Sequence, residues 1–118
     1  GVESVEAMGQ KPLAYVHLDY GGKSGRPGSG VILCCASGPT YHCSYYASAY
    51  SQWGAIHSPN LGDFEFPWAA TKILKRIKEM VKTNKPPVPY EEMIEGIAIA
   101  TAARLSQKEH RKIYLKEV

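Results

Sequence analysis

The spacing of apolar side chains changes once along this chain of 118 residues, and that change limits the folds it can adopt. Through residues 1–58 apolar and polar side chains tend to alternate, which is typical of β-strands. From Phe66 onward apolar side chains recur at the spacing of an amphipathic helix, and residues 112–116 alternate again. Strands followed by helices predict an α+β fold: a predominantly antiparallel β-sheet with two C-terminal helices packed on one face and a final strand.

Three stretches of the first half predict particular strands. Leu13–Tyr20 alternates, and the apolar run at 30–37 predicts a strand that is covered on both faces or lies centrally in the sheet. Residues 40–50 are rich in tyrosine and predict one long strand, with a turn at 51–54 and a return strand at 55–57. Because both faces of 40–50 carry large side chains with polar tips, we expect this strand to meet another surface.

The helical half is divided by prolines. A first helix runs from Phe66 to near Asn84 and stops because Pro86 and Pro87 cannot continue it. A second helix starts after Pro89, with two glutamates in its first turn, where the helix dipole favours acidic residues. The apolar stripes of the two helices are predicted to be Ala70, Ile73, Leu74, Ile77, Met80 and Val81 in the first, and Ile94, Ile97, Ala98, Thr101 and Leu105 in the second. Small residues of the second helix are expected to permit close packing: Gly96, Ala98, Ala100, Ala102 and Ala103.

The segment GGKSGRPGSG at 21–30 resembles the end of a nucleotide-binding phosphate loop but lacks its context. The first glycine of that motif would stand at His17, and the glycines and proline after Lys23 do not begin a helix. A dinucleotide GxGxxG pattern fails because Leu33 takes the place of the third glycine. We therefore interpret the segment as a hairpin connection between two strands.

Composition is ordinary for a globular protein, with 44% apolar and 21% charged residues, and the length predicts a single domain over 1–118. The longest apolar run, 31–36, is too short to span a membrane, so no membrane partner is expected. Three cysteines do not make a disulfide framework, and a reducing cytoplasm is the simpler assumption. A tight turn at 37–40 would place Cys34 opposite Cys43, where either two thiols or a disulfide is conceivable.

The sequence does not contain the common short motifs for catalysis or metal binding. There is no CxxC, HExxH or GxSxG. The two histidines that could meet, His42 and His57, have no acidic ligand at short spacing, and Cys43 is predicted on the opposite strand face from His42, so no metal site is predicted. Asp63 and Glu65 fit a helix entry better than paired acid–base catalysis. The lysine-rich stretch 72–85 is interpreted as the solvated face of a helix, with nucleic acid as the less favoured alternative.

The second half contains a distinctive series of segments. These are Phe66-Pro67-Trp68, the amphipathic helix ending in EMVKTNKPPVP, the following YEEM, and an alanine-rich helix that runs into AARLSQK and a basic strand, RKIYL. The series resembles the end of the glucose-fructose oxidoreductase and inositol dehydrogenase (Gfo/Idh/MocA) family. Residues 2–7, the hairpin around 37–39 and the return at 54–56 resemble strands of the same sheet.

The resemblance implies that the chain is a C-terminal substrate-binding and oligomerisation domain. Full-length relatives add an N-terminal Rossmann domain that binds NAD or NADP, with a Glu-Lys-Pro motif and an aspartate-to-histidine motif for catalysis. None of these motifs occurs in this sequence, so no catalytic residue and no cofactor-binding residue is assigned here, and the isolated chain is expected to be inactive. The implied partners are a sugar-like substrate and further copies of the chain, which would form a homo-oligomer through the open sheet face. We expect that face at the tyrosine-rich strand 40–50.

Four residues are candidate substrate contacts: His42, Tyr46, Trp53 and His57. Each has a polar tip near a predicted strand end, although aromatic side chains of this kind also pack at protein interfaces. The alternative function is therefore a stand-alone binding or dimerisation module without enzymatic activity, and sequence alone does not separate the two.

Overall fold

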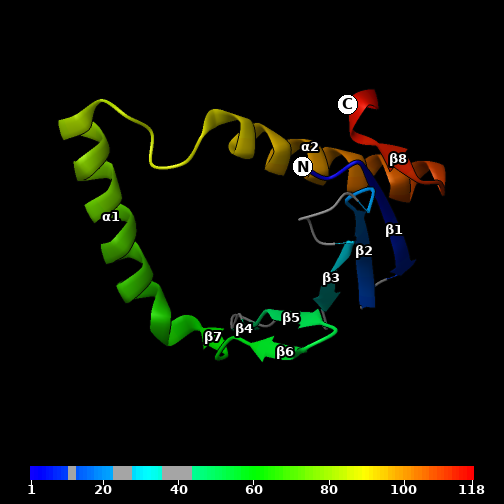
Figure 1. The fold of residues 1–118 in the computed structure, drawn as a ribbon, viewed down its shortest axis with the longest axis horizontal. Helices are drawn as coiled ribbons and strands as arrows, with labels where there is room; N and C mark the ends of the chain where they lie inside the picture. The colour runs from blue at the N-terminus through cyan, green and yellow to red at the C-terminus, as the bar shows by residue number, and fades with distance from the viewer. Residues whose placement is uncertain (11–12, 23–27, 36–43) are drawn as a thin grey trace. The chain divides into compact units, whose positions relative to one another are not determined.

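The computed structural model describes residues 1–10, 13–22, 28–35 and 44–118 (Figure 1). Within these ranges the chain forms short strands, two α-helices and two turns of 3₁₀ helix. The strands are β1 (Ser4–Gln10), β2 (Leu13–Asp19), β3 (Ser29–Cys35), β4 (Ser44–Tyr45), β5 (Ser48–Ser51), β6 (Gly54–His57), β7 (Leu61–Gly62) and β8 (Ile113–Tyr114). The helices are η1 (Asp63–Glu65), α1 (Phe66–Thr83), α2 (Tyr90–Glu109) and η2 (Leu115–Glu117).

The chain divides into two compact units, one formed by residues 1–38 and 88–118 and the other by residues 39–87. The first unit contains an antiparallel sheet in the order β3-β2-β1-β8, with α2 packed against β1 (Figure 1). The α+β fold class predicted from the change in apolar spacing is thus confirmed, with α2 as the helix that covers this sheet.

The core of the first unit is small. Val5 and Ile113 are fully buried and face each other across the β1–β8 pair, and Val5 is also paired with Leu18 on β2. Ala102 brings α2 close to this cluster, since its small side chain allows near approach of helix and sheet. Val2 completes the buried apolar set.

The face of α2 that packs on the sheet differs from the predicted stripe. Ile94 and Ile97 are 64% and 69% exposed, whereas Ala102 and Ser106 are fully buried. Ala102 is one of the small residues expected to permit close packing, and it lies at the contact because a helix close to a sheet presents its small residues to it. Ile99 and Ala103 pack beside the core, as does the predicted Leu105.

The prediction that residues 30–37 form a central or doubly covered strand is wrong for the part that the structure describes. β3 is at the end of the strand order, and Val31 and Leu33 are 62% and 60% exposed. Cys34 is exposed and free, and its strand partner is Ala14. Cys43 and the proposed turn at 37–40 lie outside the described residues.

Two strand predictions hold at the ends of the sheet. β2 and β3 pair antiparallel with Asp19 opposite Ser29, so the GGKSGRPGSG segment connects two hairpin strands as expected. The final strand is shorter than the predicted 112–116, because η2 begins at Leu115.

In the second unit, the long strand predicted at 40–50 is wrong in the described part, 44–50. β4 pairs with β7, whereas β5 pairs with β6 in a separate two-stranded sheet. The chain changes partner between them, where the Ala47 N–H donates to the Ser58 hydroxyl at 2.8 Å. The turn at 51–54 and the return strand are confirmed by the β5–β6 pairing.

The first helix begins and ends as predicted. The Gly62 N–H donates to the Glu65 carboxylate at 2.7 Å, so Glu65 has the helix-entry role expected of it. α1 ends at Asn84, which adopts the left-handed conformation (φ 51°) before the two prolines. No residue of α1 is buried, so its predicted apolar stripe is exposed within its own unit. Neither described helix combines the length and apolar character needed to cross a membrane.

Candidate functional site

Of the four predicted substrate contacts, two lie on one hairpin. His57 ends β6, and Trp53, in the turn between β5 and β6, is 88% exposed. Tyr46, 72% exposed, lies between β4 and β5 and belongs to neither strand. His42 lies outside the described residues, so the proposed meeting of His42 and His57 stays a prediction.

Local hydrogen bonds define the turn of the β5–β6 hairpin. The Trp53 N–H donates to the Ser51 hydroxyl oxygen at 3.1 Å, and that hydroxyl donates to the Gly54 carbonyl at 3.4 Å. Gly54 has φ 135°, a backbone conformation that residues other than glycine rarely adopt. The side chain of Ser51 thus holds a turn that presents Trp53 to solvent.

A polar and aromatic cluster occupies one face of this hairpin. Ser48 is directly opposite His57, and its hydroxyl oxygen lies 2.8 Å from His57 Nδ1. Tyr50, two residues along β5, shares this face, and its ring stands at 77° to the imidazole with 5.8 Å between centroids. We call Ser48, Tyr50 and His57 the hairpin cluster.

Ser48 and Tyr50 were not predicted as site residues, although the sequence contains a signal for them. With the turn centred on residues 52 and 53, counting outward places position 48 opposite 57 and position 50 on the same face. Because one long strand was predicted at 40–50, the candidate contacts were placed near strand ends and not at cross-strand pairs such as Ser48 and His57.

The base of the hairpin is closed by a second serine. The Ser58 N–H donates to the Ala47 carbonyl at 2.8 Å, while the Ser58 hydroxyl accepts from the Ala47 N–H at 2.8 Å and donates to the Pro59 carbonyl at 2.9 Å. These bonds extend the hydrogen-bond ladder of the hairpin one step beyond the strands. The hairpin cluster therefore lies between the turn fixed by Ser51 and the base fixed by Ser58.

Ion pairs of the first unit involve Asp19 and Arg111. The Gly21 N–H donates to Asp19 at 2.9 Å, and this bond, together with the Lys112 ammonium 3.7 Å away, lowers the pKa of the Asp19 carboxyl. Arg111 bonds Glu117 at 2.9 Å and Glu109 at 2.6 Å, which raises the pKa of the guanidinium and lowers that of the Glu117 carboxyl. The side chains of these ion pairs are 31–46% exposed. Arg111 connects Glu109 at the end of α2 to Glu117 in η2.

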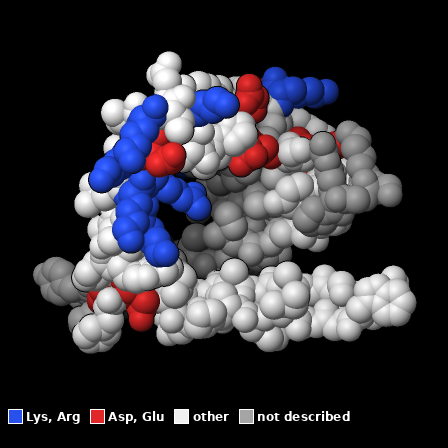
Figure 2. Space-filling view, turned by 60° about the vertical axis from the view of Figure 1, so that its left-hand side comes forward, with Lys and Arg blue, Asp and Glu red and all other residues white. Residues whose placement is uncertain are grey.

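The basic residues of α1 form the most positive stretch of the second unit. Figure 2 shows Lys and Arg side chains gathered together on part of the surface. Lys72 lies over the Trp68 ring, 5.0 Å from its centroid. The cationic set of the helix and the linker after it is Lys72, Lys75, Arg76, Lys78, Lys82 and Lys85.

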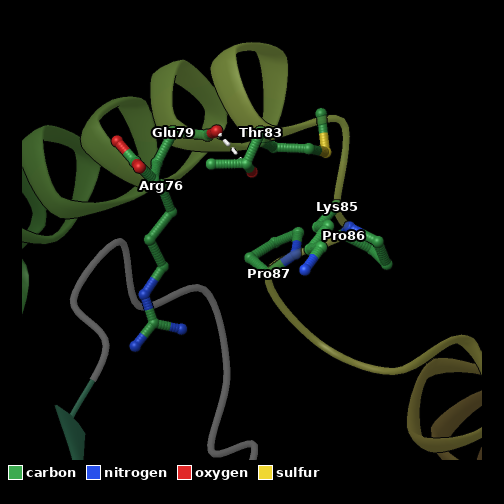
Figure 3. A pocket seen from close by; sticks show the side chains of 7 residues that line it. Arg76, Glu79, Thr83, Lys85, Pro86 and Pro87 are labelled. Atoms are coloured by element: carbon green, nitrogen blue, oxygen red, sulfur yellow. Dashed lines mark hydrogen bonds between the residues drawn. The ribbon is translucent and has the colours of Figure 1, made fainter.

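An open hollow lies at the end of α1, where the chain leaves the helix through Pro86 and Pro87 (Figure 3). The Thr83 hydroxyl donates to the Glu79 carbonyl at 2.8 Å beside it. A second shallow hollow, lined by Val2, Glu3 and residues 114–116, lies on the first unit. Neither hollow is lined by any of the described predicted substrate contacts.

The part of the chain that the structure describes holds no group of three or more His, Cys, Asp or Glu arranged for a metal ion. Comparison with family models, curated proteins and solved structures found no match. The hairpin cluster is therefore the candidate site on geometry alone: an imidazole and a hydroxyl in contact, beside an exposed aromatic ring.

Proposed function

We propose that the chain is the C-terminal substrate-binding and oligomerisation domain of an NAD(P)-dependent dehydrogenase that acts on a sugar, polyol or related compound. The observation that supports it most is the first unit's sheet, with α2 on one face and exposed apolar side chains on the other. The row Met8, Tyr15 and Leu33 crosses that other face, and Leu33 is 60% exposed. A sheet with one helix-covered and one open apolar face is what the resemblance to the Gfo/Idh/MocA family implies.

In this proposal NAD or NADP belongs to a part of the protein beyond these residues, and the chain by itself does not turn over substrate. The open face of the first unit's sheet, rather than the expected long strand at 40–50, joins copies of the chain. The hairpin cluster contributes to a substrate site. The protein acts in the cytoplasm, without nucleic acid or membrane as partner.

The first test is the intact mass of the native gene product in its source cells, detected with an antibody raised against this chain. A product about three times larger is expected, because a Rossmann half of ordinary domain size and its connections would precede this domain. A product of the chain's own mass would contradict the dehydrogenase proposal. It would favour the alternative, a stand-alone binding or dimerisation module.

A second test uses the 118-residue chain alone. Adding NAD or NADP with a panel of sugars and polyols should leave the nicotinamide absorbance unchanged, because no residue of this chain is assigned to the cofactor. A measurable rate would show that the chain carries catalysis itself and would overturn the division of roles proposed here.

A further inference from the structure

We propose that the β5–β6 hairpin binds a neutral polyhydroxylated ligand, with Ser48 and His57 bonding its hydroxyl groups and Tyr50 packing against its carbon skeleton. The inference rests on the proposed function for the ligand class and assigns that ligand to particular side chains. Two of these residues, Ser48 and Tyr50, were not among the predicted contacts.

The Ser48–His57 contact determines what the imidazole can offer to a ligand. Nδ1 is occupied by the Ser48 hydroxyl at 2.8 Å, so Nε2 is the ring nitrogen left for an incoming group. If the hydroxyl donates to Nδ1, Nε2 carries the proton and donates; if it accepts, Nε2 accepts. A ligand hydroxyl is both a donor and an acceptor and can therefore pair with either tautomer, which a carboxylate or a carbonyl cannot.

Tyr50 supplies the apolar part of the site. Its side chain is 77% exposed, and its ring stands nearly perpendicular to the imidazole. Small-molecule sites combine an aromatic or apolar wall with a few placed polar groups. A sugar or cyclic polyol has that dual character, since C–H groups line its faces and hydroxyl groups its rim, so one molecule can use the ring and the Ser48–His57 pair together.

The charge distribution favours a neutral ligand over a phosphorylated or acidic one. Residues 27–62 contain no Lys, Arg, Asp or Glu, although 21% of the whole chain is charged. Phosphate and carboxylate groups are usually held by Arg or Lys. The hairpin offers neither within its own sequence, whereas its serines, tyrosines and histidine suit uncharged hydroxyl groups.

The test is an NMR titration of the full isotope-labelled chain with methyl β-glucopyranoside and with myo-inositol as probes. We expect saturable shifts of the His57 imidazole signals. Ser48→Ala and Tyr50→Ala should each weaken binding about threefold to tenfold, since each removes one hydrogen bond or one aromatic contact. Tyr50→Phe should bind nearly as well as the original chain, because it keeps the ring.

Ser44→Ala is the matched control, since it also removes an exposed strand hydroxyl, one that donates to Asn60 at 2.6 Å outside the hairpin cluster. The proposal is overturned if the His57 signals do not move, if Ser48→Ala binds as Ser44→Ala does, or if glucose 6-phosphate binds as tightly as the neutral glucoside. The amide spectrum of each variant establishes that it is folded.

The outcome is separable from that of the proposed function. If the ligand binds and the native mass equals that of this chain, the hairpin site is supported and the dehydrogenase proposal is contradicted. If the native product is large and no ligand binds at the hairpin, the dehydrogenase proposal is supported and the hairpin site is contradicted.

Discussion

At the scale of single residues, Ser106 is expected to stabilise the fold through two hydrogen bonds of its hydroxyl group. It is fully buried, its hydroxyl accepts from the Ala7 N–H at 2.9 Å, and it donates to the Arg111 carbonyl at 2.6 Å. One hydroxyl thus joins α2, β1 and the segment before β8. Ser106→Ala should lower the free energy of unfolding by about 1–3 kcal/mol, because two part-buried backbone groups lose their partner.

Urea denaturation followed by circular dichroism measures this loss. Thr101→Ala is the matched control, because it removes a hydroxyl from the exposed side of the same helix, where it donates to the Ile97 carbonyl at 2.9 Å. Equal midpoints for the two variants would show that the buried bonds of Ser106 do not stabilise the fold.

A second residue-scale prediction concerns pH. The pKa of the Asp19 carboxyl is lowered by the Gly21 N–H and by Lys112, so its stabilisation is complete above the ordinary aspartate pKa of about 4 and is lost as the pH falls through the lowered value. Asp19→Asn should therefore be less stable than the original chain at neutral pH, with the difference shrinking in acid. Unfolding curves across this range test it, and a difference independent of pH would contradict it.

At the scale of elements, the end of α2 is held in a conformation that its residue does not favour. His110 has φ 54° in the left-handed region, and its N–H donates to the Ser106 carbonyl at 2.8 Å. Glycine adopts this conformation without steric cost, so His110→Gly should raise the free energy of unfolding by about 0.5–1 kcal/mol. Lys108→Gly, inside the helix, should instead lower it by about 1 kcal/mol. Thermal unfolding distinguishes the two signs, and a loss of stability in both variants would refute the capping argument.

The sequence predicts most elements but not the way they pair and pack. Prolines at 86, 87 and 89 and the apolar spacing from Phe66 locate both helices, because these effects act within a few residues. The packed face of α2 depends instead on distance to the sheet, which selects Ala102 and Ser106 over Ile94 and Ile97. Likewise, the change of strand partner after Tyr45 depends on long-range pairing. That pairing creates the Ser48–His57 contact, which residue types alone do not indicate.

At the scale of the whole molecule, both units expose large apolar side chains. Val31 and Leu33 of β3 are 62% and 60% exposed, and Ile73 and Leu74 of α1 are 58% and 65% exposed. Association of such side chains with another surface would remove apolar area from water, which is favourable.

The open face of the first unit's sheet is where we expect copies of the chain to meet. Tyr15 pairs with Met8 on one side and with Leu33 on the other, and its hydroxyl contacts the Met8 sulfur at 3.3 Å. A lysine at the Leu33 end of this apolar row would have to be desolvated on association. Leu33→Lys should therefore convert the expected oligomer to a monomer without unfolding the chain, which sedimentation velocity and circular dichroism would measure.

Ile94→Lys, at an equally exposed apolar site on α2 outside this face, should leave the oligomer intact. A monomeric original chain, or dissociation by Ile94→Lys but not by Leu33→Lys, would show that the sheet face does not join copies of this protein.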